Sequence, residues 1–205
     1  MDLRTLSDLV PELIMAGRFE EAEAKLMEAY RKASEEHDAE ALGEHVLPML
    51  VQLHCSSEPP NLAKAEAFSL EREQLDPRAY TKLQTAMMLY HVRGDHSRAV
   101  AKLHEAIGQG KKENDDSTVY SSLSVLGQAL LQLGRKNEAA QVLQEIEQMI
   151  FAKKAVVVGD ETLFLEGARA QGLEVPTIKR LASTLAPLCR DPEFETRLKA
   201  LANGS

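Results

Sequence analysis

Histidine and acidic side chains form the first candidate site in this sequence. His91, Asp95 and His96 lie close together, and His104 follows them. Two histidines on a helix bind zinc when they are spaced at i and i+4, so that both rings share one face. His91 and His96 are separated by five positions, with Gly94 between them. We therefore interpret this cluster as polar surface and expect no metal site.

His54 and Cys55 are the second candidate, because an imidazole can activate a thiol as a nucleophile. Adjacent residues point in different directions, however, and no orienting Asn or Asp is evident. The chain also contains no dinucleotide-binding glycine pattern, no Walker loop, no G-x-S-x-G and no H-E-x-x-H. We therefore expect a protein that is not an enzyme and holds no cofactor.

The composition indicates an all-α protein. Leu, Ala, Glu and Lys, which favour helices, dominate the 205 residues. A hydrophobic content of 44% suffices for a core, and the aromatic content of 4% predicts that this core is aliphatic. The run Ala155-Val156-Val157-Val158 is the one β-branched stretch. A single strand leaves its own edges unpaired, so we expect a helix end or a buried linker there.

The net charge and the cysteines indicate the cellular compartment of the protein and the classes of partner that it does not bind. A formal charge of −8 argues against nucleic acid and against an anionic membrane as partners. No apolar stretch is long enough to span a bilayer, and the first residues do not resemble a signal peptide. Cys55 and Cys189 are far apart in sequence and resemble reduced, partly buried thiols. We expect a cytoplasmic protein.

The segment from Tyr120 to Ile150 shows the organisation of the chain most clearly. Apolar residues at helical spacing precede Gly134, and a second apolar face follows it. The first face contains Leu123, Leu126 and Leu130, and the second contains Ala139, Val142, Leu143, Ile146, Met149 and Ile150. This pattern predicts a hairpin of two helices with a glycine turn between them.

Three earlier segments align with this hairpin. In the second helix of each unit, one aligned position holds a small residue, namely Ala22, Ala65, Ala99 or Ala139. The position four residues later holds Leu26, Ser69, Leu103 or Leu143. The turn holds Gly17, Gly94 and Gly134, with Pro60 in the second unit. Two units are longer than the others, which we attribute to exposed loops at 55–61 and 108–116. Ser117 is the expected N-cap of the helix after the second loop.

These units resemble tetratricopeptide repeats over residues 1–150. The closest matches are Gly94-Asp95-His96 through Ala106, Leu126-Gly127 with Gly134 and Ala139, and Asp76-Pro77 after a second helix. The family's early Trp is missing from every unit. The resemblance implies a right-handed α-solenoid of about four hairpins over residues 1–158. Beyond Gly159 the repeat pattern stops, and we expect helices at 160–171, 176–189 and 192–202 to form a C-terminal cap.

The resemblance also implies a function, because the first helices of such hairpins line a concave groove that holds a peptide or a helix. The groove residues would be Arg4, Ser7, Glu40, Leu47, Leu50, Thr81, Gln84, Met88, His91, Ser121, Ser124, Gln128 and Gln132. The Lys, Asn and Arg pairs with which some members clamp a terminal carboxylate are absent, apart from Arg4. The neutral, partly apolar lining suits an amphipathic helix or a mixed peptide.

We therefore expect a non-catalytic module that binds a protein or peptide partner. Two alternatives remain open from the sequence. An incompletely covered apolar end would pair two copies in a homodimer, and a space between groove and cap would let the protein sense a signalling peptide or a small ligand. The apolar residues assigned to the groove have an alternative role as well, namely packing against neighbouring helices.

Overall fold

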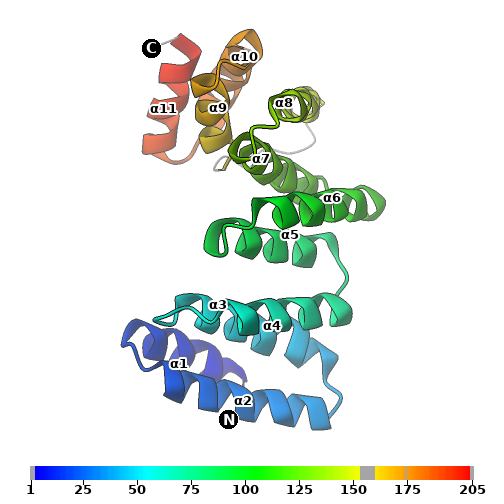
Figure 1. Cartoon of the computed structure of the whole chain (residues 1–205), viewed down its shortest axis with the longest axis vertical. Helices are drawn as coiled ribbons and strands as arrows, with labels where there is room; N and C mark the ends of the chain where they lie inside the picture. Colours follow the sequence, from blue (N-terminus) through cyan, green and yellow to red (C-terminus); the bar gives the residue numbers. More distant parts are fainter. Residues whose placement is uncertain (1–2, 153–159, 174, 204–205) are drawn as a thin grey trace.

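The computed structural model describes residues 3–152, 160–173 and 175–203, and these residues form helices with no strand among them. Figure 1 shows them as successive helices. Their bounds are α1 Leu3–Met15, α2 Phe19–Glu35, η1 Ala41–Val46, α3 Leu47–Ser56, α4 Leu62–Leu75, α5 Ala79–Met87, η2 Met88–Val92, α6 His96–Glu113, α7 Asp116–Gln132, α8 Lys136–Phe151, α9 Asp160–Ala170, α10 Val175–Leu185, η3 Ala186–Leu188 and α11 Pro192–Asn203. The all-α prediction is confirmed. The expected linker Ala155–Val158 lies outside the described residues.

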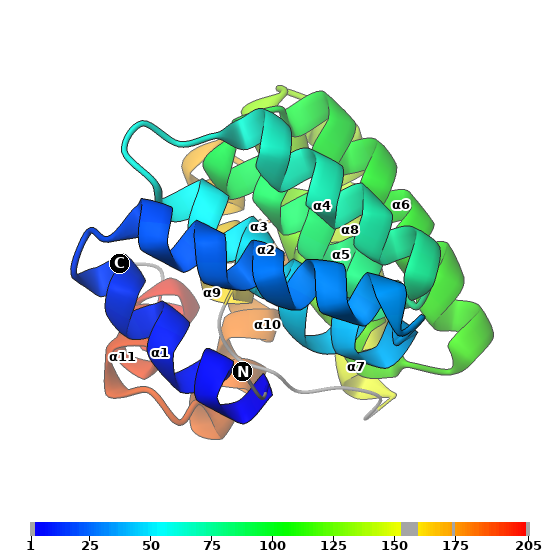
Figure 2. The same ribbon diagram turned by 90° about the horizontal axis from the view of Figure 1, so that it is seen from below.

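Helix pairs follow one another along the long axis of the molecule. In Figure 1, α1 and α2 lie at the lower end, and α3 with α4, α5 with α6 and α7 with α8 succeed them. The helices α9, α10 and α11 lie at the opposite end. Seen along this axis in Figure 2, α4 and α6 lie on one side of the stack and α1, α10 and α11 on the other.

Glycines in the left-handed backbone region make the turns within the helix pairs. The φ angles are 71° at Gly17, 67° at Gly94, 69° at Gly134 and 75° at Gly172. Only glycine adopts this conformation without a steric penalty. At Gly17, Gly134 and Gly172, the N–H of the next residue donates to the carbonyl five positions earlier, over 2.8–3.0 Å. The turn between α9 and α10 therefore repeats the turns predicted earlier in the chain.

The position that holds a small residue in the second helix of each pair is buried in every case. Ala22, Ala65, Ala99 and Ala139 each have 0% of their surface exposed. In α10 the equivalent position, five residues after the turn glycine, is the buried Thr177, and Leu181 lies four residues later with 0% exposed. The sequence predicts that the repeat pattern stops at Gly159. This spacing shows the same pattern in α9 and α10, where a threonine replaces the alanine.

The expected loop at 108–116 is wrong, because α6 continues as far as Glu113. Gly110 is buried, and a Cβ added there would lie 2.8 Å from Cγ2 of Val119. The glycine therefore permits close packing of α6 and α7 and does not make a turn. Asn114, with φ 57°, ends the helix. The Asp115 carboxylate, and not Ser117, caps α7 by accepting the N–H of Thr118 at 3.0 Å.

The apolar core divides between the two halves of the stack. One cluster of buried side chains extends from Leu83 to Leu201, and another extends from Leu6 to Leu53. A third, smaller cluster joins η2 to α3 through Met88 and Leu89. Each helix pair therefore buries its apolar face mainly against neighbours in its own half.

Several hydrogen bonds and ion pairs connect α4 to α5 and α6. Ser69 and Thr85 are hydrogen-bonded through their hydroxyls at 2.7 Å, and both are buried. Glu73 of α4 accepts from Nζ of Lys102 at 3.0 Å, and Glu66 pairs with both Arg93 and Arg98. We call this set of contacts the polar joint.

Candidate interaction surface

The residues predicted to line a groove divide by their exposure. Arg4, Ser7, Glu40, His91 and Gln132 are exposed, Gln84 and Ser121 are partly exposed, and Leu47, Leu50, Thr81, Met88, Ser124 and Gln128 are buried. The buried members do not present a surface to a ligand in this structure. The accessible members are polar and come from α1, α5, η2 and α7, together with Glu40 just before η1.

Packing between neighbouring helices explains the first buried members. Leu47 belongs to the N-terminal apolar cluster, and Met88 packs with Leu89 and Ala99 in the small cluster. The hydroxyl of Thr81 donates to Oδ2 of Asp76 at 2.8 Å. Leu47 and Met88 thus take the packing role that the sequence left open as the alternative to a groove.

The helix α9 accounts for the burial on α7. The ring of Phe164 lies over Gly127, where an added Cβ would come within 2.3 Å of Cζ. A Cβ added at Gly167 would likewise lie 3.2 Å from Leu131 of α7. Ser124 is three residues before Gly127 and shares its helical face. Its hydroxyl donates to the carbonyl of Tyr120 at 3.2 Å.

The histidine cluster and the Cys55 thiol are the two candidates for chemistry that the sequence offers. Within the described parts of the chain, no three His, Cys, Asp or Glu side chains gather as metal ligands. Burial raises the pKa of the Cys55 thiol, which opposes formation of the nucleophilic thiolate. Cys55 and Cys189 are both free and partly buried.

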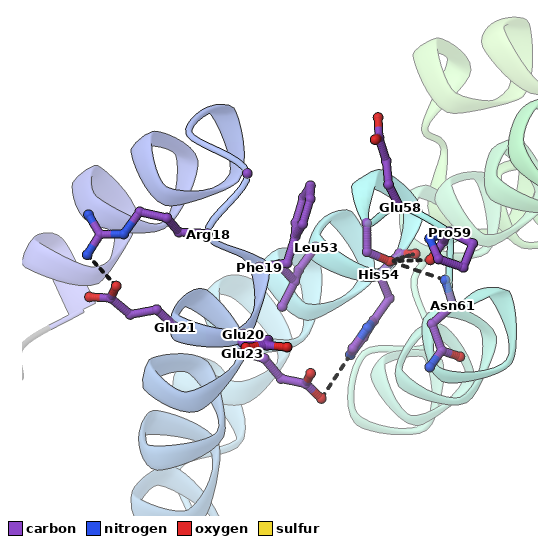
Figure 3. Close-up of a pocket in the computed structure, with 12 residues that line it drawn as sticks. Arg18, Phe19, Glu20, Glu21, Glu23, Leu53, His54, Glu58, Pro59 and Asn61 are labelled. Atoms are coloured by element: carbon purple, nitrogen blue, oxygen red, sulfur yellow. Dashed lines mark hydrogen bonds and ion pairs between the residues drawn. The ribbon is translucent and has the colours of Figure 1, made fainter.

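A pocket of about 660 Å³ lies between the α1–α2 turn and the loop that joins α3 to α4. Figure 3 shows Phe19 and Leu53 on one side and Pro59 and Asn61 on the other. Its lining comprises Gly17, Arg18, Phe19, Glu20, Glu21, Glu23, Leu53, His54, Ser57, Glu58, Pro59 and Asn61. We call it the acidic pocket, because carboxylates outnumber cations in this lining.

Two of the carboxylates in the acidic pocket have cationic partners. Glu21 pairs with Arg18, and Glu23 pairs with Lys64 of α4. Glu20 and Glu58 have no hydrogen bond or ion pair within the part of the chain that the structure describes. The pocket therefore retains an excess of negative charge on its walls.

His54 forms the floor of the acidic pocket together with Glu23. The His54 side chain is buried, and its Nε2 lies 3.7 Å from Oε1 of Glu23 (Figure 3). Its ring stacks on Phe68 with centroids 5.7 Å apart. Burial lowers the pKa of His54; the nearby Glu23 carboxylate opposes this shift, and Lys64 adds to it. The imidazole is therefore neutral at pH 7.

From the sequence, His54 is a candidate only as the partner of Cys55, and this pocket is not predicted. Its lining comes from residues 17–23 and 53–61, which are distant in sequence. A usable signal was the distribution of charge along the chain. Residues 1–75 contain sixteen acidic and seven basic side chains, a net charge of −9, whereas residues 76–205 contain sixteen acidic and seventeen basic ones, a net charge of +1.

Comparison with protein-family models and with curated proteins finds no match to this chain. Among the helices within the described ranges, none is both long enough and apolar enough to cross a membrane. The chemistry of the surface is therefore inferred from its geometry: accessible polar side chains on the first helices of the pairs, and one acidic pocket at the N-terminal end.

Proposed function

We propose that this protein is a non-catalytic interaction module that binds a protein or peptide partner. In this proposal the chain is a right-handed α-solenoid of tetratricopeptide-like hairpins whose C-terminal helices cap one end. The observation that carries the proposal is the repeated turn, in which Gly17, Gly94, Gly134 and Gly172 all have φ between 67° and 75°. A repeated hairpin with one apolar face cannot bury that face alone, and stacked hairpins provide an extended surface for partners.

The partner lies against the accessible polar residues of the first helices. These are Arg4, Ser7, Gln84, His91, Ser121 and Gln132. The amide of Gln84 already donates to the hydroxyl of Tyr80 at 2.8 Å, and the His91 ring meets that of Tyr90 with centroids 4.7 Å apart. Amide and hydroxyl groups of this kind hydrogen-bond to the main chain of a bound peptide.

The C-terminal helices act as the cap. Phe164 of α9 covers Gly127 of α7, so the end of the stack does not leave the apolar face of α7 open to water. The guanidinium of Arg197 on α11 donates to Oε1 of Glu166 on α9 at 2.8 Å. A polar outermost helix is what a terminal repeat needs for solubility.

Affinity capture with matched variants tests the proposal. Wild-type protein, a surface variant carrying His91→Glu and Gln132→Glu, and a control carrying Gln141→Glu and Gln144→Glu on α8 are each incubated with native lysate. All four positions are exposed, so both variants fold. We expect mass spectrometry to identify a protein retained by the wild type and the control and lost by the surface variant.

The captured protein is then purified and its affinity measured by calorimetry. A loss of about tenfold or more in the surface variant, with the control unchanged, agrees with contact at these positions. Equal affinity for all three proteins contradicts binding on this surface, and no captured protein at all contradicts the proposed function.

Self-association is the second candidate, favoured by large apolar side chains at the C-terminal end. Leu163, Val175 and Leu188 are exposed by 42%, 41% and 49%. Light scattering of the purified chain separates the two functions. An interaction module of the kind proposed has the monomer mass of 22.7 kDa, whereas a homodimer has twice that mass at micromolar concentration.

A further inference from the structure

We propose that the acidic pocket binds the side chain of a Lys or Arg residue of the protein partner, with the cation held between Glu23 and His54. This inference rests on the proposed function in so far as the cation belongs to a protein. It adds a second contact site at the N-terminal end of the stack and specifies the chemistry of the partner.

The floor of the pocket offers two hydrogen-bond acceptors to one cation. Nε2 of His54 is buried and has no hydrogen-bond partner among the described residues. Glu23 Oε1 is 3.7 Å away, too far for a hydrogen bond between the two but near enough for one N–H-bearing cation to approach both. A neutral imidazole that carries its proton on Nδ1 accepts at Nε2. A ligand N–H therefore satisfies an acceptor that the protein itself leaves unpaired.

Glu23 already holds an ammonium group in the free protein. Lys64 Nζ pairs with its Oε1, and the Lys64 side chain is half exposed. This pair shows that the carboxylate is placed to bind an ammonium group. A cation supplied by a partner competes with Lys64 or binds beside it, so removal of the Lys64 charge strengthens binding.

The walls suit the rest of a long basic side chain. Phe19, Leu53 and Pro59 provide apolar surface for the methylene groups, as Lys and Arg stems require. Glu58 points outward at the rim in Figure 3, where a second cation of the partner meets it. The volume of about 660 Å³ exceeds that of one side chain and leaves room for the flanking main chain.

The field of the surrounding protein favours the same ligand. The net charge of −9 on residues 1–75 exceeds in magnitude the −8 of the whole chain. A concentrated negative charge attracts cationic ligands and speeds their association. An acidic peptide is repelled at this end of the molecule.

A peptide titration tests the pocket. The probe is a fluorescein-labelled peptide with two arginines among alanines and leucines, blocked at both ends. One matched peptide has citrulline, the neutral isostere, in place of both arginines, and another has glutamate. We expect saturable binding of the arginine peptide by fluorescence anisotropy, binding at least tenfold weaker for the citrulline peptide, and none for the glutamate peptide.

Variants locate the binding. Glu23→Gln and Glu58→Gln should each weaken the arginine peptide by about threefold to tenfold, and Lys64→Gln should strengthen it. Glu28→Gln and Glu36→Gln change the charge of the same half at exposed positions outside the pocket and should alter affinity by less than twofold. The Hε1 resonance of His54 should shift on binding in the wild type. Thermal unfolding of each variant confirms that it is folded.

Three other outcomes overturn the proposal. Equal weakening by pocket and control variants means that only the general field attracts the peptide. Spermidine that binds as tightly as the peptide means that the ligand is a small amine and not a protein segment. Absence of peptide binding while the captured partner still binds at His91 and Gln132 refutes the acidic pocket alone. Binding of the arginine peptide without any captured protein contradicts the proposed function alone, and the acidic pocket stands.

Discussion

Phe164 of α9 packs over Gly127 of α7 so closely that a Cβ at residue 127 would lie 2.3 Å from the ring Cζ. Phe164 is fully buried, so its ring is enclosed by other parts of the protein. This contact joins α9 to α7 and removes one face of α7 from solvent. A larger residue at position 127 is therefore expected to disturb the packing of α9 on α7.

Gly127→Ala should destabilise the protein although alanine favours helices. The helix-propensity gain is about 1 kcal/mol, whereas overpacking a filled core costs about 1–3 kcal/mol. We expect a net loss of about 1 kcal/mol by urea unfolding followed with circular dichroism. Gly108→Ala is the matched control, because Gly108 is helical, exposed and has no atom within 4 Å of an added Cβ. A stability of Gly127→Ala equal to that of the control refutes the close contact.

Backbone handedness gives a second prediction. Gly134 has φ 69° with open space around it, so Gly134→Ala should cost about 1–2 kcal/mol through the left-handed conformation alone. His37 has φ 55° and already bears this cost, so His37→Gly should stabilise the protein by up to about 1 kcal/mol. Thermal unfolding measures the change in stability of both variants. Changes of the same sign in the unfolding temperature of Gly134→Ala and His37→Gly contradict this prediction.

The polar joint predicts a non-additive pair of substitutions. Ser69→Ala leaves the buried hydroxyl of Thr85 with only a 3.3 Å bond to the carbonyl of Thr81. Loss of a buried partner costs about 1–3 kcal/mol, while replacement of both polar groups by apolar ones is nearly neutral. We therefore expect Ser69→Ala with Thr85→Val to be less destabilised than the sum of the single variants. A double-mutant cycle by urea unfolding checks this, and strict additivity contradicts direct coupling.

The helices and their turns could be predicted from the sequence because they depend on local patterns. Gly17, Gly94 and Gly134 occupy turns because a positive φ excludes most other residues. Gly110 misled the prediction, since a glycine that allows two helices to approach resembles one that makes a turn. The sequence predicts both helices of the α9–α10 pair, but their turn was not assigned to the repeat pattern because Thr177 occupies the position held elsewhere by alanine.

The candidate site could be predicted less well, because exposure depends on contacts between distant segments. Ser124 has the polarity of a surface residue, yet α9 covers its face of α7. The acidic pocket needs the turn after α1 and the loop after α3 to meet, and neither segment indicates the other. Uneven charge along the chain is the one feature of the sequence that points to the N-terminal half.

The pH dependence of stability provides the last prediction, at Asp76. Its carboxylate accepts from Nε of Arg78 at 2.7 Å and from the hydroxyl of Thr81, and these bonds lower its pKa to about 2. The unfolded chain has a pKa near the ordinary value of about 3.9, so the folded state binds the proton less tightly. The stabilisation is therefore complete above this value and is lost as the pH falls through about 2.

Arg78 is largely exposed, so screening by water reduces the contribution to about 1 kcal/mol. Asp76→Asn should be less stable than the wild type by this amount at pH 7 and should approach it as the pH is lowered from about 4 to about 2. Urea unfolding at each pH measures the difference, and Asp8→Asn at an exposed position of α1 controls for the change in net charge. A difference that stays constant over this range excludes the ionised Asp76 as its source.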